Sequence, residues 1–127
     1  MAFEDDVFDM SFIAGEALTS SQYHFVYLTA NNTVKTCSHA TSQKAIGILQ
    51  NAPASGGIAR VRLMGVSRAI IGTATCAFGD KVGTDASGHC IAKDTDKYNY
   101  CGICIMGGAA AEKATVLLYG PKKISKA

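Results

Sequence analysis

The chain contains the stretch Ile46-Gly-Ile-Leu-Gln-Asn-Ala-Pro-Ala-Ser-Gly-Gly-Ile-Ala-Arg-Val-Arg-Leu-Met-Gly65, and the same pattern returns 55 positions later, so that Gly47 falls on Gly102 and Gly65 on Gly120. The second copy reads Gly102-Ile-Cys-Ile-Met-Gly-Gly-Ala-Ala-Ala-Glu-Lys-Ala-Thr-Val-Leu-Leu-Tyr-Gly120. An ungapped internal match of this kind indicates a duplicated supersecondary unit. Two copies favour a closed, pseudo-symmetric β domain over a solenoid, which needs at least three repeats.

Each copy predicts a strand, a loop of small residues and a second strand. In the first copy Ala59, Val61 and Leu63 alternate with Arg60 and Arg62. This period of two places apolar groups on one face and charges on the other, as expected for a strand over Ile58–Met64. The equivalent strand, Lys113–Tyr119, repeats the inward residues.

The outward residues of that second strand are Thr115, Leu117 and Tyr119, which make its outer face largely apolar. An apolar strand face of this kind indicates burial. Either another subunit covers it, or the N-terminal segment of the chain folds back over it.

Composition indicates one globular domain that belongs to the all-β class. The chain has 127 residues, of which 48% are hydrophobic, 17% are charged and 13 are Gly, and it shows no long amphipathic helical pattern. The formal net charge of +2 is too small to predict nucleic-acid binding. The N-terminal sequence lacks the features of a signal peptide, and no apolar run approaches the length of a membrane span. We therefore expect synthesis in the cytoplasm, without a membrane partner.

The sequence predicts three parts. They are an extended N-terminal arm over residues 1–15, a single β domain over 16–121 with pseudo-repeats at about 12–65 and 66–120, and a short basic tail over 122–127. The arm combines acidic residues with aromatic ones, and a solvated tail would not hold that many aromatics. It is interpreted either as an arm that docks on its own subunit or on a neighbour, or as an edge strand with a frayed terminus. Its acidic and aromatic residues are Glu4, Asp5, Asp6 and Asp9, and Phe3, Phe8 and Phe12.

Two hairpins are predicted upstream of the repeated stretches. The first spans residues 24–36 with a turn at Asn31-Asn32, and the second spans 81–92 with a turn at 85–88. Thr29 falls on Thr84 at the same offset of 55. Residues 93–100 are interpreted as a polar insertion in a surface loop, and Pro121 is expected to end the last strand.

The five cysteines are expected to be reduced and mostly buried. Cys101 and Cys104 form a C-x-x-C motif, but the repeat places it in a strand, where residues three apart point to opposite faces and lie about 10 Å apart. Redox activity is therefore not expected. A zinc site is also not expected, because the spacings differ from those of structural zinc sites. Its possible ligands are Cys37, His39, His89, Cys90, Cys101 and Cys104.

No catalytic pattern is recognised, so we expect a protein that is not an enzyme and binds no cofactor. Ser20, Ser21 and His24 lie close together in the sequence, but no nucleophile elbow surrounds them. Arg60, Arg62 and Arg68 have no neighbouring aromatic residues for base stacking. They are interpreted as a solvated strand face or as a charged subunit contact.

Four segments of the chain together resemble the capsid decoration (cement) proteins of tailed bacteriophages. They are Tyr27–Val34, Ile46–Pro53, Val61–Val66 and Gly79–Gly88. The resemblance covers about residues 12–120. It implies a small β-barrel or β-tulip-like domain that forms homotrimers at local threefold axes on the outer surface of the virion and clamps neighbouring major capsid subunits. The cysteines and the 93–100 segment are not typical of that family.

The residues and the resemblance together predict a structural virion protein with a contact surface. Residues Phe3, Phe8, Met10 and Phe12 are expected to dock the arm, and Leu117 and Tyr119 to bury a subunit interface. Deletion of residues 2–12 is expected to weaken binding to the shell and to leave the β domain folded. The alternative is a soluble β-barrel module that binds a ligand or zinc.

Overall fold

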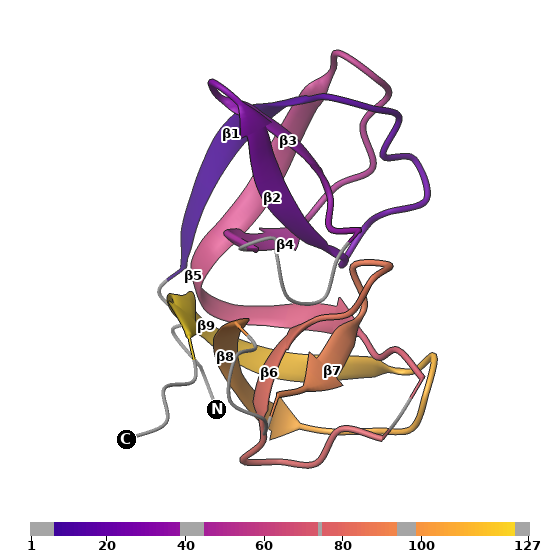
Figure 1. Ribbon diagram of the computed structural model, residues 1–127, viewed down its shortest axis with the longest axis vertical. Coiled ribbons are helices and arrows are strands. Elements are labelled where there is room, and N and C mark those ends of the chain that lie inside the picture. The colour runs from indigo at the N-terminus through magenta and orange to yellow at the C-terminus, as the bar shows by residue number, and fades with distance from the viewer. Residues whose placement is uncertain (1–6, 39–44, 74, 94–98, 124–127) are drawn as a thin grey trace, which may run out of the picture.

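The computed structural model describes residues 7–38, 45–73, 75–93 and 99–123, and within these ranges the chain forms nine β-strands and no helix. The predicted all-β class and the small β-barrel are therefore confirmed. Figure 1 shows two stacked units joined by one long strand. The strands are β1 (Phe8–Ala14), β2 (Phe25–Ala30), β3 (Thr33–Thr36), β4 (Gly47–Leu49), β5 (Ile58–Ile70), β6 (Lys81–Thr84), β7 (Cys90–Ala92), β8 (Asn99–Met106) and β9 (Lys113–Lys123).

The first unit is a closed barrel of five strands. Its strand order is β1-β3-β2-β4-β5, and β5 closes the ring by pairing antiparallel with β1 along Phe8↔Met64 to Ile13↔Ile58. The β1–β3 pair is parallel, with Ile13 opposite Thr33. Because every strand has two neighbours, the ring leaves no edge exposed.

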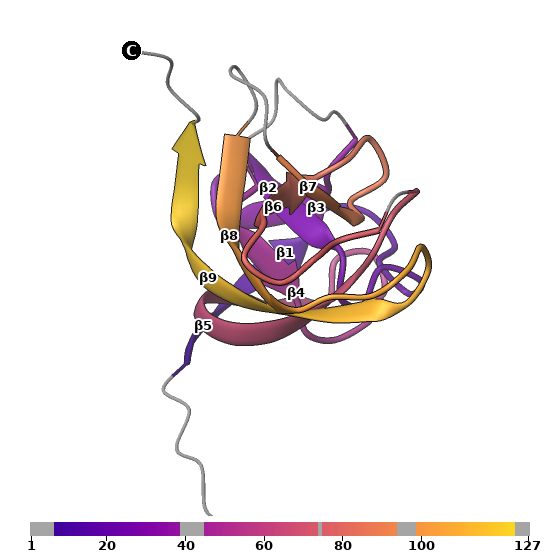
Figure 2. The same ribbon diagram turned by 90° about the horizontal axis from the view of Figure 1, so that it is seen from below.

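The second unit repeats this order with the second half of β5 in the place of β1. From β1, the first ring can also be followed as β1-β5-β4-β2-β3, and the second unit has the matching order β5-β9-β8-β6-β7. A parallel bridge between Ile71 and Cys90 takes the place of the parallel β1–β3 pair. Figure 2 shows β5, β9 and β8 curving in succession around this unit. β5 therefore belongs to both units, and it bends between them at Gly65, whose φ is 102°.

The pairing registers show where the offset of 55 holds. Ile48↔Arg62 in the first unit corresponds to Ile103↔Leu117 in the second, which is an offset of 55 in both strands. In the hairpins, however, Leu28↔Val34 corresponds to Thr84↔Cys90, which is an offset of 56. Thr84 is thus equivalent to Leu28, and its predicted match with Thr29 is wrong by one residue.

The repeated glycines Gly47 and Gly102 have a common steric cause. A Cβ on Gly47 would collide with the carbonyl oxygen of Arg62, and a Cβ on Gly102 would collide with that of Leu117. Arg62 and Leu117 are themselves 55 positions apart. At this equivalent position in each unit, two strands therefore approach so closely that only glycine fits.

The hydrophobic core consists of two clusters. The smaller cluster fills the first barrel and includes Phe12, Val26 and Val61. The larger cluster fills the second unit, but it also contains Phe25 and Ile48 from the first. The two units therefore share buried surface and form one packed body.

Three parts of the chain differ from the predictions made for them. Residues 8–14 of the predicted arm form β1, so this part of the segment belongs to the first barrel, and residues 1–6 lie outside the described ranges. Lys93, which was expected in a surface loop, is 1% exposed. It occupies the position equivalent to Cys37, because Lys93 N donates to Lys81 O just as Cys37 N donates to Phe25 O. Because both units have this connection, the 93–100 segment is not an insertion.

Pro121 does not end the last strand, because β9 continues to Lys123. Beyond Leu118 the strand pairs with β8 alone, since its pairing with β5 stops at Gly65↔Leu118. A proline, which has no N–H to donate, is tolerated where a strand has a free edge.

No helix in the described part of the chain is long and apolar enough to cross a membrane.

Candidate binding surface

Two groups of exposed or half-buried apolar side chains meet on β5. Phe8 and Met64 lie opposite each other in the β1–β5 pair and are 53% and 51% exposed. Two positions along β5, Val66 lies opposite Leu117, and Leu117 in turn lies opposite Ile103 of β8. We call Phe8, Met64, Val66, Leu117 and Ile103 the β5 apolar face.

The face results from alternation along the strands. Val116 and Leu118 point inward and are buried, so Leu117 between them points outward and is 40% exposed. The same rule places Met64 outside the barrel, while Val61 is buried within it. The predicted inward and outward residues of Ile58–Met64 and Lys113–Tyr119 are thus confirmed.

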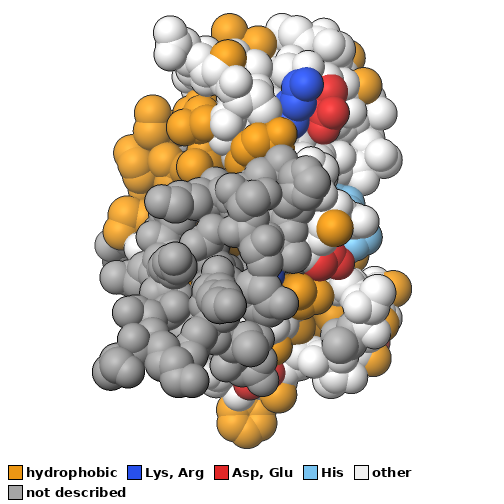
Figure 3. Space-filling view, in the orientation of Figure 1, with side chains coloured by type: hydrophobic (Ala, Val, Ile, Leu, Met, Phe, Trp, Pro, Cys, Tyr) orange, Lys and Arg blue, Asp and Glu red, His pale blue; other side chains and the backbone are white. Residues whose placement is uncertain are grey.

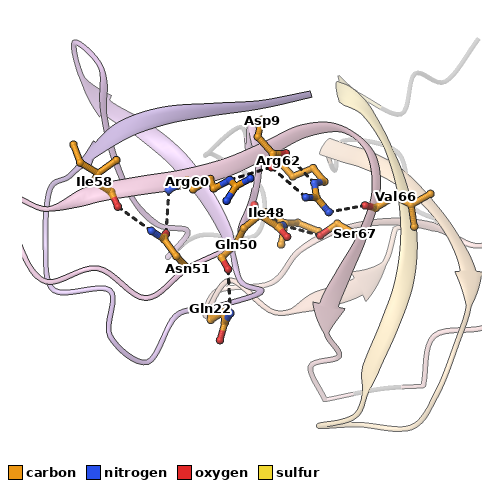
Figure 4. Close-up of polar contacts among 10 residues, drawn as sticks. All are labelled: Asp9, Gln22, Ile48, Gln50, Asn51, Ile58, Arg60, Arg62, Val66 and Ser67. Carbon is orange, nitrogen blue, oxygen red and sulfur yellow. Dashed lines mark hydrogen bonds and ion pairs between the residues drawn. The ribbon is translucent and has the colours of Figure 1, made fainter. Parts of the chain in front are cut away.

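A partly buried ion cluster fixes β1 to β5 beside this face. The carboxylate of Asp9 accepts two hydrogen bonds from Arg62, at 2.8 Å from Nε and 3.1 Å from Nη2, and Nε of Arg60 lies 3.4 Å from it. Hydrogen bonding to Arg62 is the main cause that lowers the pKa of Asp9 below its ordinary value. Nη1 of Arg62 also donates to the carbonyl of Val66 at 3.0 Å, which spans the bend at Gly65 (Figure 4).

The six residues predicted for contacts occupy different environments. Phe8 and Met10 are exposed on β1, but Phe12 is buried in the first barrel and cannot contact another molecule. Leu117 belongs to the β5 apolar face. The ring of Tyr119 is half-buried and lies edge-on to that of Tyr100, with centroids 6.1 Å apart. Phe3 lies outside the described residues.

A second exposed apolar group was not predicted from the sequence. Phe78 is 81% exposed in the β5–β6 connection, and Ile105 and Met106 are exposed at the end of β8. Gly79 N donates to Cys104 O at 2.8 Å, which brings these two segments together. In Figure 3 hydrophobic atoms protrude from the second unit at the lower end of the molecule. The only available signal was the position of Phe78 in a glycine-containing loop.

All five cysteines are free and buried. Cys101 and Cys104 both lie in the larger core cluster, so the prediction that they point to opposite faces is wrong. The register of β8 against β9 shifts between Tyr100 and Gly102, and an irregularity of this kind interrupts the alternation of side chains. Burial raises the pKa of Cys37 and of Cys101 to about 12.

Among the described residues, no three His, Cys, Asp or Glu side chains are arranged to hold a metal ion, and His39 lies outside the described ranges. His24 and His89 do meet, with ring centroids 4.7 Å apart, and Nδ1 of His89 lies 3.6 Å from Asp85. Burial is the main cause that lowers the pKa of His24. Figure 3 shows histidine side chains at the waist of the molecule, between the two units. This pair packs the 85–88 turn of the second unit against the first.

A scan against models of protein families finds no match, and a search of curated proteins finds none either. Among solved structures, the fold is similar to that of the N base of head fiber gp8.5 of bacteriophage phi29, with a TM-score of 0.66 and 11% sequence identity. The alignment covers 95% of this chain and 100% of that chain. At this identity the similarity concerns the fold, which extends over both units.

Proposed function

We propose that this protein is a non-enzymatic structural component of a phage virion. It binds as a homotrimer to the outer surface of the assembled head, at local threefold axes, and stabilises contacts between major capsid subunits. The observation that carries the proposal is the β5 apolar face, which brings together exposed and half-buried apolar side chains from four strands. Two likenesses support it: the fold of a phage head fiber base, and the sequence resemblance to capsid decoration proteins.

The physical basis of the stabilisation is mass action. A protein that binds only the assembled shell stabilises the shell by its binding free energy. A trimer gains further, because its second and third contacts form at a high effective concentration. Modest apolar patches therefore suffice, provided that each is buried on binding.

Two matched double variants test the role of the face. Met64→Ser with Leu117→Ser removes its two most exposed β5 and β9 side chains, and Ile105→Ser with Met106→Ser makes an equal change outside it. We expect the first pair to reduce occupancy on shells prepared without the protein at least tenfold, about 1.4 kcal/mol, and the second to leave it within about twofold. Cosedimentation with shells measures occupancy, and sedimentation velocity measures the oligomer. Equal occupancy for both pairs would refute the role of the face.

A test of the role of the N-terminal segment requires a shorter deletion than that of residues 2–12. That deletion would remove most of β1 together with Asp9, and would therefore open the first barrel. Deletion of residues 2–6 leaves β1 intact and separates the contribution of the segment from that of the fold.

A ligand-binding module remains the second candidate function. One observation favours it: an open groove at the bend of β5, of about 330 Å³, which lies at the lower end of the range of about 300–1,000 Å³ for ligand pockets.

A further inference from the structure

The groove lies where β5 passes from the first unit to the second. Val66, Ser67 and Arg68 of β5 line it, together with Gln50, which follows β4, and Thr115 of β9. Tyr23 and Arg62 complete its wall. Both units thus contribute to it, and its shape depends on the bend at Gly65.

Of the two arginines that line the groove, Arg62 is held by partners within the protein. Arg62 gives Nε and Nη2 to Asp9 and Nη1 to the carbonyl of Val66 (Figure 4). Its charge is balanced by Asp9, so its role is to hold the bend and the wall of the groove in place.

Arg68, in contrast, has no acidic partner among the described residues. Its side chain is exposed, and Thr115 lies directly opposite it in the β5–β9 pair. A second cation lies nearby, since Nζ of Lys113 is 5.6 Å from the centroid of the Tyr23 ring. Of the described residues that line the groove, none is acidic. The uncompensated charge of the groove is therefore positive.

The remaining lining groups are neutral hydrogen-bonding side chains. Nε2 of Gln50 donates to Oγ of Ser67 at 2.9 Å and to the carbonyl of Ile48 at 3.1 Å, which fixes the amide in place (Figure 4). The hydroxyl of Ser67 in turn donates to the carbonyl of Arg68 at 2.9 Å, so the amide and the hydroxyl are both used within the protein. The guanidinium of Arg68 is left to pair with a carboxylate, which accepts several hydrogen bonds at once.

Tyr23 supplies a separate indication that this is a functional place. Its φ is 67°, a left-handed conformation that a bulky residue rarely adopts. Two backbone hydrogen bonds hold it there: Tyr23 N donates to Leu49 O at 2.8 Å, and Ile70 N donates to Tyr23 O at 3.2 Å. Residues held in sparsely populated conformations cluster at binding sites.

We propose that the groove at the β5 bend binds an acidic peptide segment of a partner protein, whose carboxylate pairs with Arg68 and whose neighbouring apolar side chain covers Val66. The apolar part follows from continuity, because Val66 also belongs to the row Val66–Leu117–Ile103 that leads away from the groove. Polyphosphates fit less well, because Arg68 and Lys113 are the only cations that the described residues offer there without an acidic partner. The proposal does not rest on the proposed virion role.

A titration of the full-length, ¹⁵N-labelled protein followed by NMR tests the proposal. The probe is the acetylated and amidated peptide Leu-Asp-Glu-Leu, and its neutral analogue is Leu-Asn-Gln-Leu. We expect saturable shifts of the Gln50, Ser67, Arg68 and Thr115 amides with the acidic peptide alone. Arg68→Gln should weaken binding at least fivefold, whereas Arg60→Gln, on the same strand but outside the groove, should leave it within about twofold.

Four results of the titration would overturn the proposal. Equal affinity of the wild type and Arg68→Gln, or equal affinity for the neutral peptide, would overturn the proposal. So would the absence of saturable shifts at millimolar peptide. Inorganic phosphate that binds as tightly as the acidic peptide would show a site for small anions and would overturn the peptide assignment. The spectrum of unbound Arg68→Gln shows whether that variant is folded.

Discussion

Asp9 combines structural roles that are usually divided among several residues. Its carboxylate holds Arg62, which in turn spans the bend of β5 by its bond to Val66 O, and it also attracts Arg60. Its side chain is 13% exposed, so solvent screens the Arg62 pair only in part. A single carboxylate therefore fixes the first strand, the bend and the wall of the groove.

Asp9→Asn should lower the free energy of unfolding by about 1.5–3 kcal/mol at pH 7, the range for a hydrogen bond to a charged group. Because the pKa of Asp9 is lowered on folding from 3.8, its contribution is present above about pH 4. It is lost as the pH falls through the folded-state pKa. Urea unfolding at pH 7 and at about pH 2.5 measures both values.

The control for Asp9→Asn is Arg60→Gln. The side chain of Arg60 is 64% exposed, and exposed pairs contribute little, so its effect should stay below about 0.5 kcal/mol. A difference between Asp9→Asn and the wild type that persists undiminished at the lower pH would show that the carboxylate charge is not the cause.

At the scale of the strand, Gly47 and Gly102 mark the same contact in β4 and β8. Each lies against a backbone carbonyl of the neighbouring long strand, and a backbone atom cannot move aside as the end of a flexible side chain can. The duplicated glycines therefore maintain strand contact and do not serve turns.

Gly47→Ala and Gly102→Ala should each destabilise the protein by about 3 kcal/mol, the upper end of the usual cost of overpacking. Gly79→Ala is the matched control, because nothing lies within 4 Å of its Cβ position and only its φ of 86° opposes the change, at about 1–2 kcal/mol. Denaturant midpoints of the three variants measure the difference. Equal losses at all three positions would mean that backbone conformation, and not the carbonyl contact, selects these glycines.

The sequence predicted the elements where side-chain alternation or a repeated glycine specified them. β5, β9 and the turns at Asn32 and Gly88, whose φ values are 53° and 80°, belong to this group. The sequence predicts an offset of 55 for the hairpins, where the structure has 56. The identity of Thr29 and Thr84 is a coincidence, and the sequence does not show that the loop after the second hairpin is one residue shorter. The burial of both Cys101 and Cys104 depends on a register shift against β9, which one strand alone does not reveal.

The candidate site was predictable only in part. Alternation identified Leu117 as outward, and composition identified the aromatic N-terminal segment. The sequence did not reveal that the side chain of Phe12 points into a barrel. The strands that pair with β1, which are β3 and β5, come from later parts of the chain. The groove was equally hidden, since Tyr23, Gln50, Arg68 and Thr115 meet only after both units form.

At the scale of the molecule, the two units share β5 and one core cluster. Phe25 and Ile48 of the first unit pack with Val82 and Val116 of the second. A destabilising substitution in either unit should therefore lower the stability of both, unlike in two domains joined by a linker.

Val82→Ala should reduce stability by about 2 kcal/mol, because it leaves a cavity in the shared cluster. We expect hydrogen exchange to show the same loss of protection at the Val26 amide of the first unit and the Val116 amide of the second. A loss confined to the second unit would show that the two units unfold independently.

The shared strand also has an evolutionary consequence. Since the second half of β5 starts the second unit, a duplication of the first unit has to add only the four strands β6 to β9 and needs no second barrel with its own first strand. β9 corresponds to β5, so it is the kind of strand from which another unit can begin. The architecture is thus extensible by gene duplication, and a longer homologue with a third copy would grow from β9.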